Sequence, residues 1–293
     1  FLAVRAFARE VYRAHPYATV APTAASIDAV TPGLLAAEAG RRLRPERALL
    51  LVAGDVKPEE AIAAAESAFG GWAASGSAPP PLAAPVATGG PRRILVLDRP
   101  GSVQTNLMVG NLGFPRTDPD ARALELAMTI YGGSFTSRLV QNLREAKGYT
   151  YSPGAAASWL DGCGTVRSFA AVRTEVTGAA LNEVLYEMER MATTEATDEE
   201  MDRAFRREAG SLAIALQTAA GVADEPARLW VLGLSPDEIA RFVPGLAEVT
   251  KGDVRRVSGR VFGTGSARIV AVGDAAAIRS ELGTFGEVAE GET

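Results

Sequence analysis

The chain has 293 residues, of which 47% are hydrophobic and 22% charged, with a formal net charge of -5 and a single cysteine. This composition is typical of a globular protein with a sizeable core. The acidic balance and the lack of a basic stripe argue against a nucleic-acid partner, because phosphate binding needs concentrated lysine and arginine. No apolar run approaches the roughly 18 residues of a membrane span, and one cysteine excludes a disulfide within the chain. We expect a soluble protein; the sequence does not distinguish a bacterial cytoplasm from a periplasm.

The N-terminal quarter of the chain has the pattern of helices separated by one strand. It begins with Phe1 rather than Met, inside a segment that alternates apolar and charged residues at helical spacing. We therefore expect the sequence to be a fragment or a processed piece of a longer protein. Thr31 followed by Pro32 predicts the start of a helix. Residues 49–53 are expected to form a strand and residues 58–69 another helix.

A segment rich in proline and glycine follows at residues 71–91. It is expected to be an extended linker, because such a composition does not support a regular element. After it, residues 94–98 and 104–112 have the apolar character of strands. Asp118 followed by Pro119 then predicts the start of a helix.

The remainder of the chain continues with strands and then helices. Residues 158–160 and 166–172 are expected to form antiparallel strands joined by a glycine-containing turn. From Thr177 onward apolar residues recur at helical spacing, and Thr197 with Glu200 forms a capping box. The methionines of these helices are expected to fill gaps in the core. This order favours an α+β sandwich, with helices on one face of a largely antiparallel sheet, over a doubly wound parallel fold.

An internal repeat links the two ends of the chain. Thr31 and Gly54 align with Thr250 and Gly273 at the same separation in sequence. In both copies a capped helix is followed by a strand, a Gly-Asp turn and another helix, and in the second copy the strand and last helix are expected within residues 268–282. The shared order predicts a duplicated unit.

The repeat predicts three parts of the chain. Residues 1–70 are the C-terminal remnant of a first unit, residues 71–91 are the linker, and residues 92–293 are a complete second unit. The first copy is therefore expected to be truncated, because it lacks a counterpart of the N-terminal portion of the second.

The second unit is organised around a short helix near the middle of the chain. Phe135, Leu139 and Leu143 recur at four-residue spacing, which predicts a helix that packs one apolar face on the core. Gly148 can leave the helix with positive φ, so the helix is expected to end near Lys147.

Two polar side chains flank the end of this helix. Arg144 lies in its last turn and Tyr151 in the segment that follows, so a guanidinium and a phenol are expected at one corner. A fixed cation and a hydroxyl donor can together stabilise a developing oxyanion, which makes the pair a candidate site. The same residues also fit an exposed arginine favoured by the helix dipole and a tyrosine that fills a strand position.

These residues resemble the second, non-catalytic half of pitrilysin/insulinase-family zinc peptidases, the family that includes the mitochondrial processing peptidases. The resemblance rests on the following motifs: Asp118-Pro119-Asp120, Ser137-Arg138-Leu139, Leu143-Arg144-Glu145, Gly148 and Tyr151. More loosely, it extends over the whole chain.

The resemblance implies a division of labour between two halves. In the family, an arginine and a tyrosine at the spacing of Arg144 and Tyr151 reach toward a zinc held by the other half, where they hold the peptide and help to stabilise the tetrahedral intermediate. The zinc motif His-x-x-Glu-His belongs to the portion missing from the first copy. The implied partners are a peptide substrate and a catalytic half or partner subunit, in a homo- or heterodimer. Zinc is expected in that catalytic half or partner subunit, and no metal site or catalytic residue is expected in this chain alone.

Other reactive residues carry weaker signals. His15 is the only histidine, so the chain cannot supply the histidine-rich ligand set of such a zinc site, and a structural role is expected for it. Cys163 lies in a turn far in sequence from His15, which argues against a thiol nucleophile. Gly132 to Ser134 precede a helix but lack the spacing of a phosphate-binding loop.

Two functions remain compatible with the sequence. The first is the substrate-binding, non-catalytic half of a zinc metalloendopeptidase, inactive alone. The second is a catalytically inert scaffold or assembly subunit of the same fold, like the family members that serve as core subunits of respiratory complexes. The presence of His-x-x-Glu-His upstream in the gene, or in a neighbouring chain, distinguishes the two.

Overall fold

The computed structural model describes residues 1–87 and 89–291. The chain divides into two compact units that differ from the two repeat copies. Phe1–Val20, Ala84–Gly210 and Ala240–Thr293 form the sheet unit, and Ala21–Ala83 and Ser211–Ile239 form the helical unit. Thr88, in the predicted linker, and Glu292 and Thr293, at the end of the predicted second unit, lie outside the described residues.

The sheet unit is built on a mixed sheet with the strand order β3-β4-β2-β5-β1-β6, six strands within the described residues. The strands are β1 (Arg93–Asp98), β2 (Gln104–Gly113), β3 (Gly154–Leu160), β4 (Cys163–Arg173), β5 (Arg268–Gly273) and β6 (Glu287–Gly291). The pairings β3–β4, β4–β2 and β2–β5 are antiparallel, whereas β5–β1 and β1–β6 are parallel. The largely antiparallel character predicted from the sequence is confirmed.

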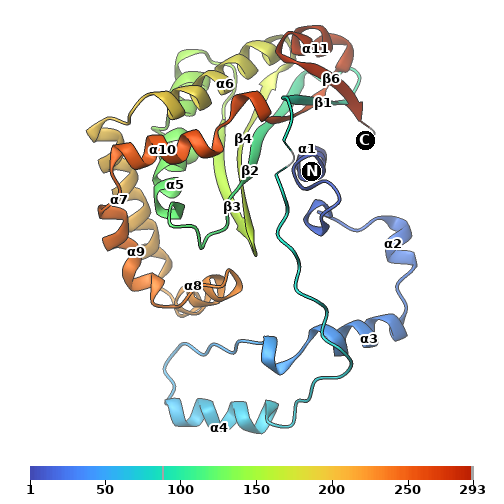
Figure 1. Ribbon diagram of the computed structural model, residues 1–293, viewed down its shortest axis with the longest axis vertical. Coiled ribbons are helices and arrows are strands. Elements are labelled where there is room, and N and C mark those ends of the chain that lie inside the picture. The colour runs from blue at the N-terminus through green and yellow to red at the C-terminus, as the bar shows by residue number, and fades with distance from the viewer. Residues whose placement is uncertain (88, 292–293) are drawn as a thin grey trace. The chain divides into compact units, whose positions relative to one another are not determined.

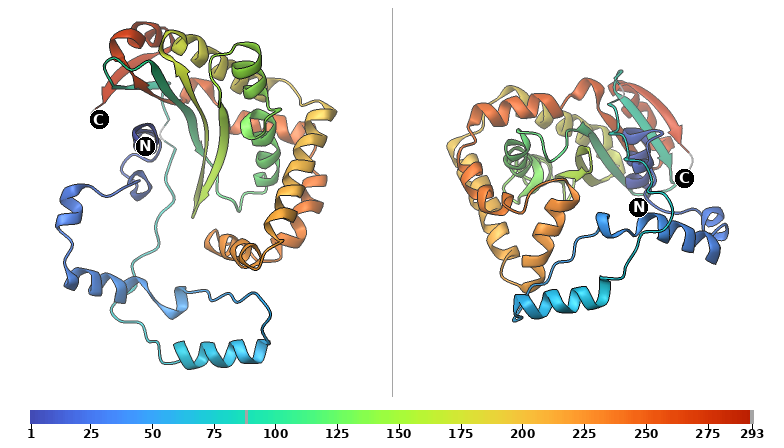
Figure 2. Two further views of the ribbon diagram at one scale, coloured as in Figure 1. Left: turned by 180° about the vertical axis from the view of Figure 1, so that it is seen from behind. Right: turned by 60° about the horizontal axis from the view of Figure 1, so that its bottom comes forward.

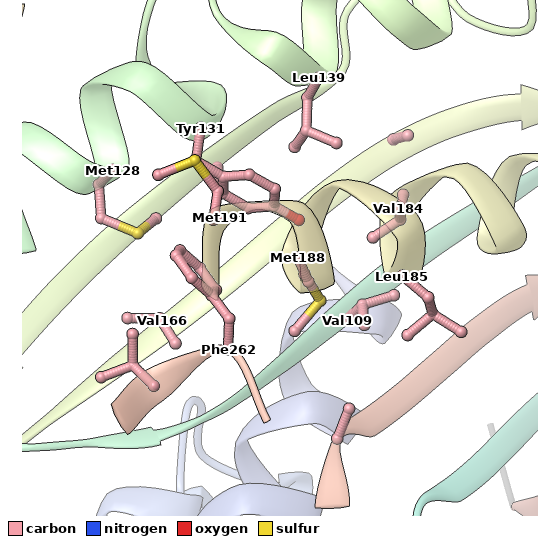
Figure 3. Packing of buried hydrophobic residues seen from close by; sticks show 14 of the residues in the cluster. Val109, Met128, Tyr131, Leu139, Val166, Val184, Leu185, Met188, Met191 and Phe262 are labelled. Carbon is pink, nitrogen blue, oxygen red and sulfur yellow. The ribbon is translucent and has the colours of Figure 1, made fainter. Parts of the chain in front are cut away.

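One face of this sheet carries the main helical layer and the main core (Figure 1). Its helices are α5 (Ala121–Met128), α6 (Thr177–Thr193), α10 (Lys251–Val261) and α11 (Ala275–Leu282). Tyr131 lies at the centre of the core, where its ring centroid is 4.7 Å from that of Phe262 and its hydroxyl is 2.6 Å from Ser168 Oγ. Met188 and Met191 fill the neighbouring space, as Figure 3 shows, which confirms the packing role expected for the methionines.

The opposite face of the sheet is covered in part by α1 (Leu2–Tyr12), as Figures 1 and 2 show. Phe7 and Val11, one helical turn apart, are buried against Met108 and Val270. The α+β sandwich is confirmed, and α1 adds a helix on the face that the sequence left uncovered.

Other helical segments lie outside these two layers or connect their elements, and the π-helical segments are Thr129–Gly133 and Val140–Ala146. The α-helices are α7 (Asp198–Ala215) and α9 (Glu238–Ala247), and the short 3₁₀ turns are Pro16–Ala18, Pro45–Arg47, Thr174–Val176, Thr264–Ser266 and Gly283–Phe285. The capping box at the start of α7 is confirmed, since Glu200 N–H donates to Thr197 Oγ1 and Thr197 N–H donates to Glu200 Oε2.

In the helical unit, every regular element among the described residues is a helix, and irregular chain connects the helices. Its helices are α2 (Ala24–Asp28), α3 (Pro32–Arg42), α4 (Pro58–Phe69) and α8 (Ala219–Val231). Thr31 caps α3 by accepting a hydrogen bond from Leu34 N–H at 3.2 Å, and α4 occupies the predicted residues. None of α2, α3 and α4 contains a buried residue among those described.

The strand expected at residues 49–53 is wrong: the structure shows irregular chain there. A strand requires a neighbour that accepts and donates its backbone hydrogen bonds, and no described segment pairs with these residues. The equivalent segment of the second copy, β5, lies between β1 and β2 and therefore has both neighbours. The described residues of 71–91 form no helix or strand.

A glycine allows a close approach between the helical layer and β3 at Gly132. A Cβ built on Gly132 would lie 2.7 Å from the backbone nitrogen of Ala155, a distance that real Cβ atoms essentially never show. We therefore expect Gly132→Ala to lower the free energy of unfolding by about 1–3 kcal/mol, because a backbone shift is needed. Thermal or urea denaturation of the purified chain measures the change.

Gly259→Ala provides the matched control. Gly259 lies in α10, and a Cβ there meets no atom within 4 Å. Alanine is expected to raise the free energy of unfolding by about 0.5–1 kcal/mol, because it restricts the unfolded chain. Equal effects of the two substitutions would contradict the close approach at Gly132.

Candidate functional site

The helix that carries Arg144 ends in π-helical turns, Val140–Ala146. Lys147 N–H donates to Asn142 O, five residues earlier, at 3.0 Å, whereas an α-helix would bond four residues back. Gly148 then leaves the helix with a φ of 62°, as predicted. Wide turns of this kind occur frequently at functional sites, and here they set the direction in which the last turn presents its side chains.

Arg144 and Tyr151 are brought together at this corner. Arg144 Cζ lies 4.4 Å from the ring centroid of Tyr151, within the range of a cation–π contact. Tyr151 is 77% exposed, and the guanidinium is partly exposed, with Nε 3.2 Å from Glu145 Oε1. The adjacency expected from the sequence is therefore present in the fold. The role of the two residues stays a prediction.

Phe135 does not lie where the sequence placed it. It was expected to face the core with Leu139 and Leu143, which are both buried, yet it is 62% exposed. The reason is that the helical turns begin only at Arg138, so Phe135 lies in the preceding turn and does not follow the helical spacing. Its ring instead lies 4.8 Å from Arg144 Cζ. No signal in the sequence indicated this contact.

The underside of the helix is held by α6 through polar contacts. The amide of Asn142 donates to Glu183 Oε2 and to Glu187 Oε1, both at 2.9 Å. Lys147 Nζ lies 3.6 Å from Glu183 Oε1, and the largely buried Glu187 is also paired with Arg190. These contacts fix the register of the π-helical turns and leave the side chain of Arg144 on the outer surface.

The start of the helix is held by a buried ion pair. Arg138 donates to both carboxylate oxygens of Glu200 on α7, at 2.7 and 2.9 Å. Burial by itself would raise the pKa of Glu200, but the hydrogen bonds from Arg138 and from Thr197 N–H outweigh that effect, so its pKa lies below the ordinary 4.5. The bidentate pair is the geometry in which arginine and carboxylate bind most strongly. The sequence indicated Glu200 only as a capping residue.

The possible metal donors among the described residues are not arranged as a zinc site. His15 Nδ1 accepts a hydrogen bond from Tyr17 N–H at 3.2 Å, so this nitrogen has a structural role. Burial raises the pKa of the Cys163 thiol to about 11, and the thiol is therefore protonated at neutral pH. Among the described residues, no group of three or more histidine, cysteine, aspartate and glutamate side chains is placed to hold a metal ion.

The described part of the chain also contains no helix that combines the length and the apolar composition needed to cross a bilayer.

A family model identifies the chain. The model for the peptidase M16 inactive domain matches residues 35–207, more than half of the sequence. The chain belongs to this family. The resemblance to the non-catalytic half of zinc peptidases, first indicated by the motifs around Arg144, is thereby confirmed.

Known proteins similar to this M16 inactive domain include zinc-protease relatives. An uncharacterized zinc protease of Streptomyces coelicolor is 27% identical over 228 residues, which cover 75% of this chain and 48% of the relative. An uncharacterized zinc protease of Mycobacterium leprae is 32% identical over 168 residues, 56% of this chain and 37% of the relative. The chain thus spans less than half the length of either relative.

Solved structures share the fold. The crystal structure of a peptidase M16 inactive domain from Pseudomonas fluorescens has a TM-score of 0.80 and 26% identity, and the match covers 93% of this chain and 65% of that one. A chain of complex III2 from Candida albicans has a TM-score of 0.79 at 14% identity, covering 98% of this chain and 70% of that one, which shows likeness of fold alone.

The ion pair between Arg138 and Glu200 predicts a pH-dependent stability. Arg138→Met is expected to lower the free energy of unfolding at pH 7 by about 3 kcal/mol, because it leaves the Glu200 carboxylate largely buried and unpaired. The pKa of Glu200 is lowered in the folded chain, so its contribution is complete above its unfolded value and is lost as the pH falls through the folded value. The difference in the free energy of unfolding between the wild type and the variant should therefore become smaller from pH 7 toward pH 3, as measured by urea denaturation.

Arg206→Met is the control for this prediction. Arg206 pairs with Asp202 on the exposed surface of α7, where an ion pair contributes at most about 1 kcal/mol. A loss of stability from Arg138→Met that is no larger than that from Arg206→Met would contradict the assigned role of the buried pair.

Proposed function

We propose that this M16 inactive domain is the substrate-binding, non-catalytic half of a pitrilysin-type zinc metalloendopeptidase. In this proposal a catalytic half or partner subunit hydrolyses the peptide bond, and Arg144 and Tyr151 assist from outside the metal site. The observation that carries the proposal is the 4.4 Å contact of these two side chains at one exposed corner, in a chain of this family.

The chemistry of the pair suits a developing oxyanion. A guanidinium is a permanent cation with several N–H donors, and a phenol adds an O–H donor. Donors that are already oriented stabilise a tetrahedral intermediate better than water, because they need little reorganisation during the reaction. The exposed edge of Arg144 and the exposed ring of Tyr151 are accessible to a peptide that a second half would bring to them.

The proposal extends to the domain organisation. Residues 1–70 would be the remnant of a first, catalytic-type unit, 71–91 the linker and 92–293 the second unit. The two copies of the repeat differ in burial in a way that supports a missing partner. Leu50 is 56% exposed while its counterpart Ile269 is 0% exposed, and Leu35 and Val254 differ in the same way, at 59% and 1%.

The expected partner is another unit of the same fold, in the same polypeptide or in a second subunit of a homo- or heterodimer. Apolar side chains at these positions are buried when a sheet and its helices are present to cover them, as in the second copy. Zinc is expected in that partner, together with the His-x-x-Glu-His motif, since the part of this chain that the structure describes places no group of donors for it.

A scaffold role is the second candidate. The likeness of fold to a chain of complex III2 from Candida albicans favours it, because an assembly subunit needs the fold but no donor pair. The gene sequence around this chain separates the candidates: the zinc motif upstream or in a partner supports the peptidase half, and its absence from both supports the scaffold.

The peptidase proposal predicts a defect in turnover without a defect in folding. In the assembled enzyme, Tyr151→Phe should lower kcat for casein cleavage by about 100-fold, the size of effect expected when one oxyanion donor is lost. Thermal stability should change little, because the hydroxyl is on an exposed residue.

Tyr186→Phe is the matched control, since it removes the same hydroxyl from an exposed tyrosine on α6. Its kcat should equal that of the wild type. Unchanged turnover in Tyr151→Phe would remove this residue from the site. Stoichiometric zinc on the isolated chain, or casein cleavage by it that a chelator abolishes, would overturn the assignment as a non-catalytic half.

The domain proposal predicts a strand that forms only with the partner. Amide hydrogens of residues 49–53 should exchange rapidly in the isolated chain, because the structure gives them no strand neighbour, and should become protected in the assembled enzyme. Hydrogen exchange followed by mass spectrometry measures this. Amides of β5 serve as the internal control and should be protected in both states; equal exchange of 49–53 in both would contradict the proposal.

A further inference from the structure

Phe135 is an exposed aromatic residue that the core does not use. Its side chain is 62% exposed, and it lies in the turn before the helix that carries Arg144. The turn itself is ordered by hydrogen bonds: Ser137 N–H donates to Ser134 O at 3.1 Å, and Gln141 Nε2 donates to Phe135 O at 3.4 Å. The backbone from which the ring projects is therefore held in place.

The ring of Phe135 contacts the guanidinium of Arg144. The distance from Arg144 Cζ to the ring centroid is 4.8 Å, similar to the 4.4 Å that separates Cζ from the ring of Tyr151. The two rings make no contact with each other within the described residues. This indicates that they approach the guanidinium from different directions.

Such contacts restrict an otherwise mobile side chain. Arginine has many rotamers on a surface, and the adjacent carboxylate of Glu145, 3.2 Å from Nε, holds it only on one side. Aromatic faces attract the flat guanidinium and leave its N–H edges available for hydrogen bonds. Two rings therefore select an orientation that Glu145 alone does not.

We propose that Phe135 is a positioning residue of the candidate site: its ring holds the guanidinium of Arg144 in the orientation in which its N–H edges face a bound peptide. Phe135 touches no reacting atom itself. The inference rests on the proposed function of Arg144 for its catalytic consequence, but the restriction of the arginine can be measured without activity.

The first experiment observes Arg144 in the chain as it is. The Nε–Hε signal of Arg144, assigned by its loss in Arg144→Lys, is followed by ¹H–¹⁵N NMR. In Phe135→Leu the signal should move, because the ring current of the phenylalanine is lost, and its order parameter should fall. In Phe135→Tyr, which keeps the ring, both should stay close to the wild type. An order parameter that does not change in Phe135→Leu overturns the proposal.

The second experiment measures casein cleavage by the assembled enzyme. Phe135→Leu should lower kcat by roughly two- to five-fold, the effect that an exposed cation–π contact supports, with a smaller change in KM. Phe135→Tyr should restore kcat. Tyr186→Leu, which removes an exposed aromatic ring on α6, should leave kcat unchanged.

The outcomes separate the two proposals. If Arg144→Lys and Arg144→Ala retain wild-type turnover, the proposed function of Arg144 fails, while the NMR result still decides whether Phe135 orders the guanidinium. If the arginine variants are impaired but Phe135→Leu is not, the positioning role of Phe135 is overturned and the proposed function stands.

Discussion

The buried pair of Arg138 and Glu200 is the constraint on which the geometry of the candidate site depends. A buried guanidinium needs a carboxylate at close range, because an unpaired charge in the interior is strongly unfavourable. That requirement ties the first helical turn after Gly132 to α7. The amide of Asn142 adds a second point of attachment on α6. Between these two points the chain widens into π-helical turns, and Arg144 is left on the outside.

The elements that the sequence predicted well are those that depend on neighbours in the chain. Threonine caps, prolines in the first helical turn and the positive φ of Gly148 are local signals, and they placed the starts of α3 and α4 and the end of the central helix at the observed residues. The adjacency of Arg144 and Tyr151 followed for the same reason, since one short turn separates them.

The elements that it missed depend on partners far away in the sequence. Whether residues 49–53 form a strand is decided by the segments beside them, not by their apolar character. The short strand β6 exists because β1 offers a parallel neighbour. Phe135 has the spacing of a core residue but lies before the first helical turn. Its contact with Arg144 depends on the path of the chain through that preceding turn. The sequence likewise contained no local signal that α1 packs on the second face of the sheet.

The reactivity of the single cysteine reports on local opening of the folded chain. Cys163 opens strand β4, is almost completely buried and has a thiol that stays protonated well above neutral pH. Alkylating reagents attack the thiolate and need access to it. Labelling of the folded chain is therefore slow, and its rate reports how often the start of β4, where Cys163 also contacts Tyr12 of α1, opens to solvent.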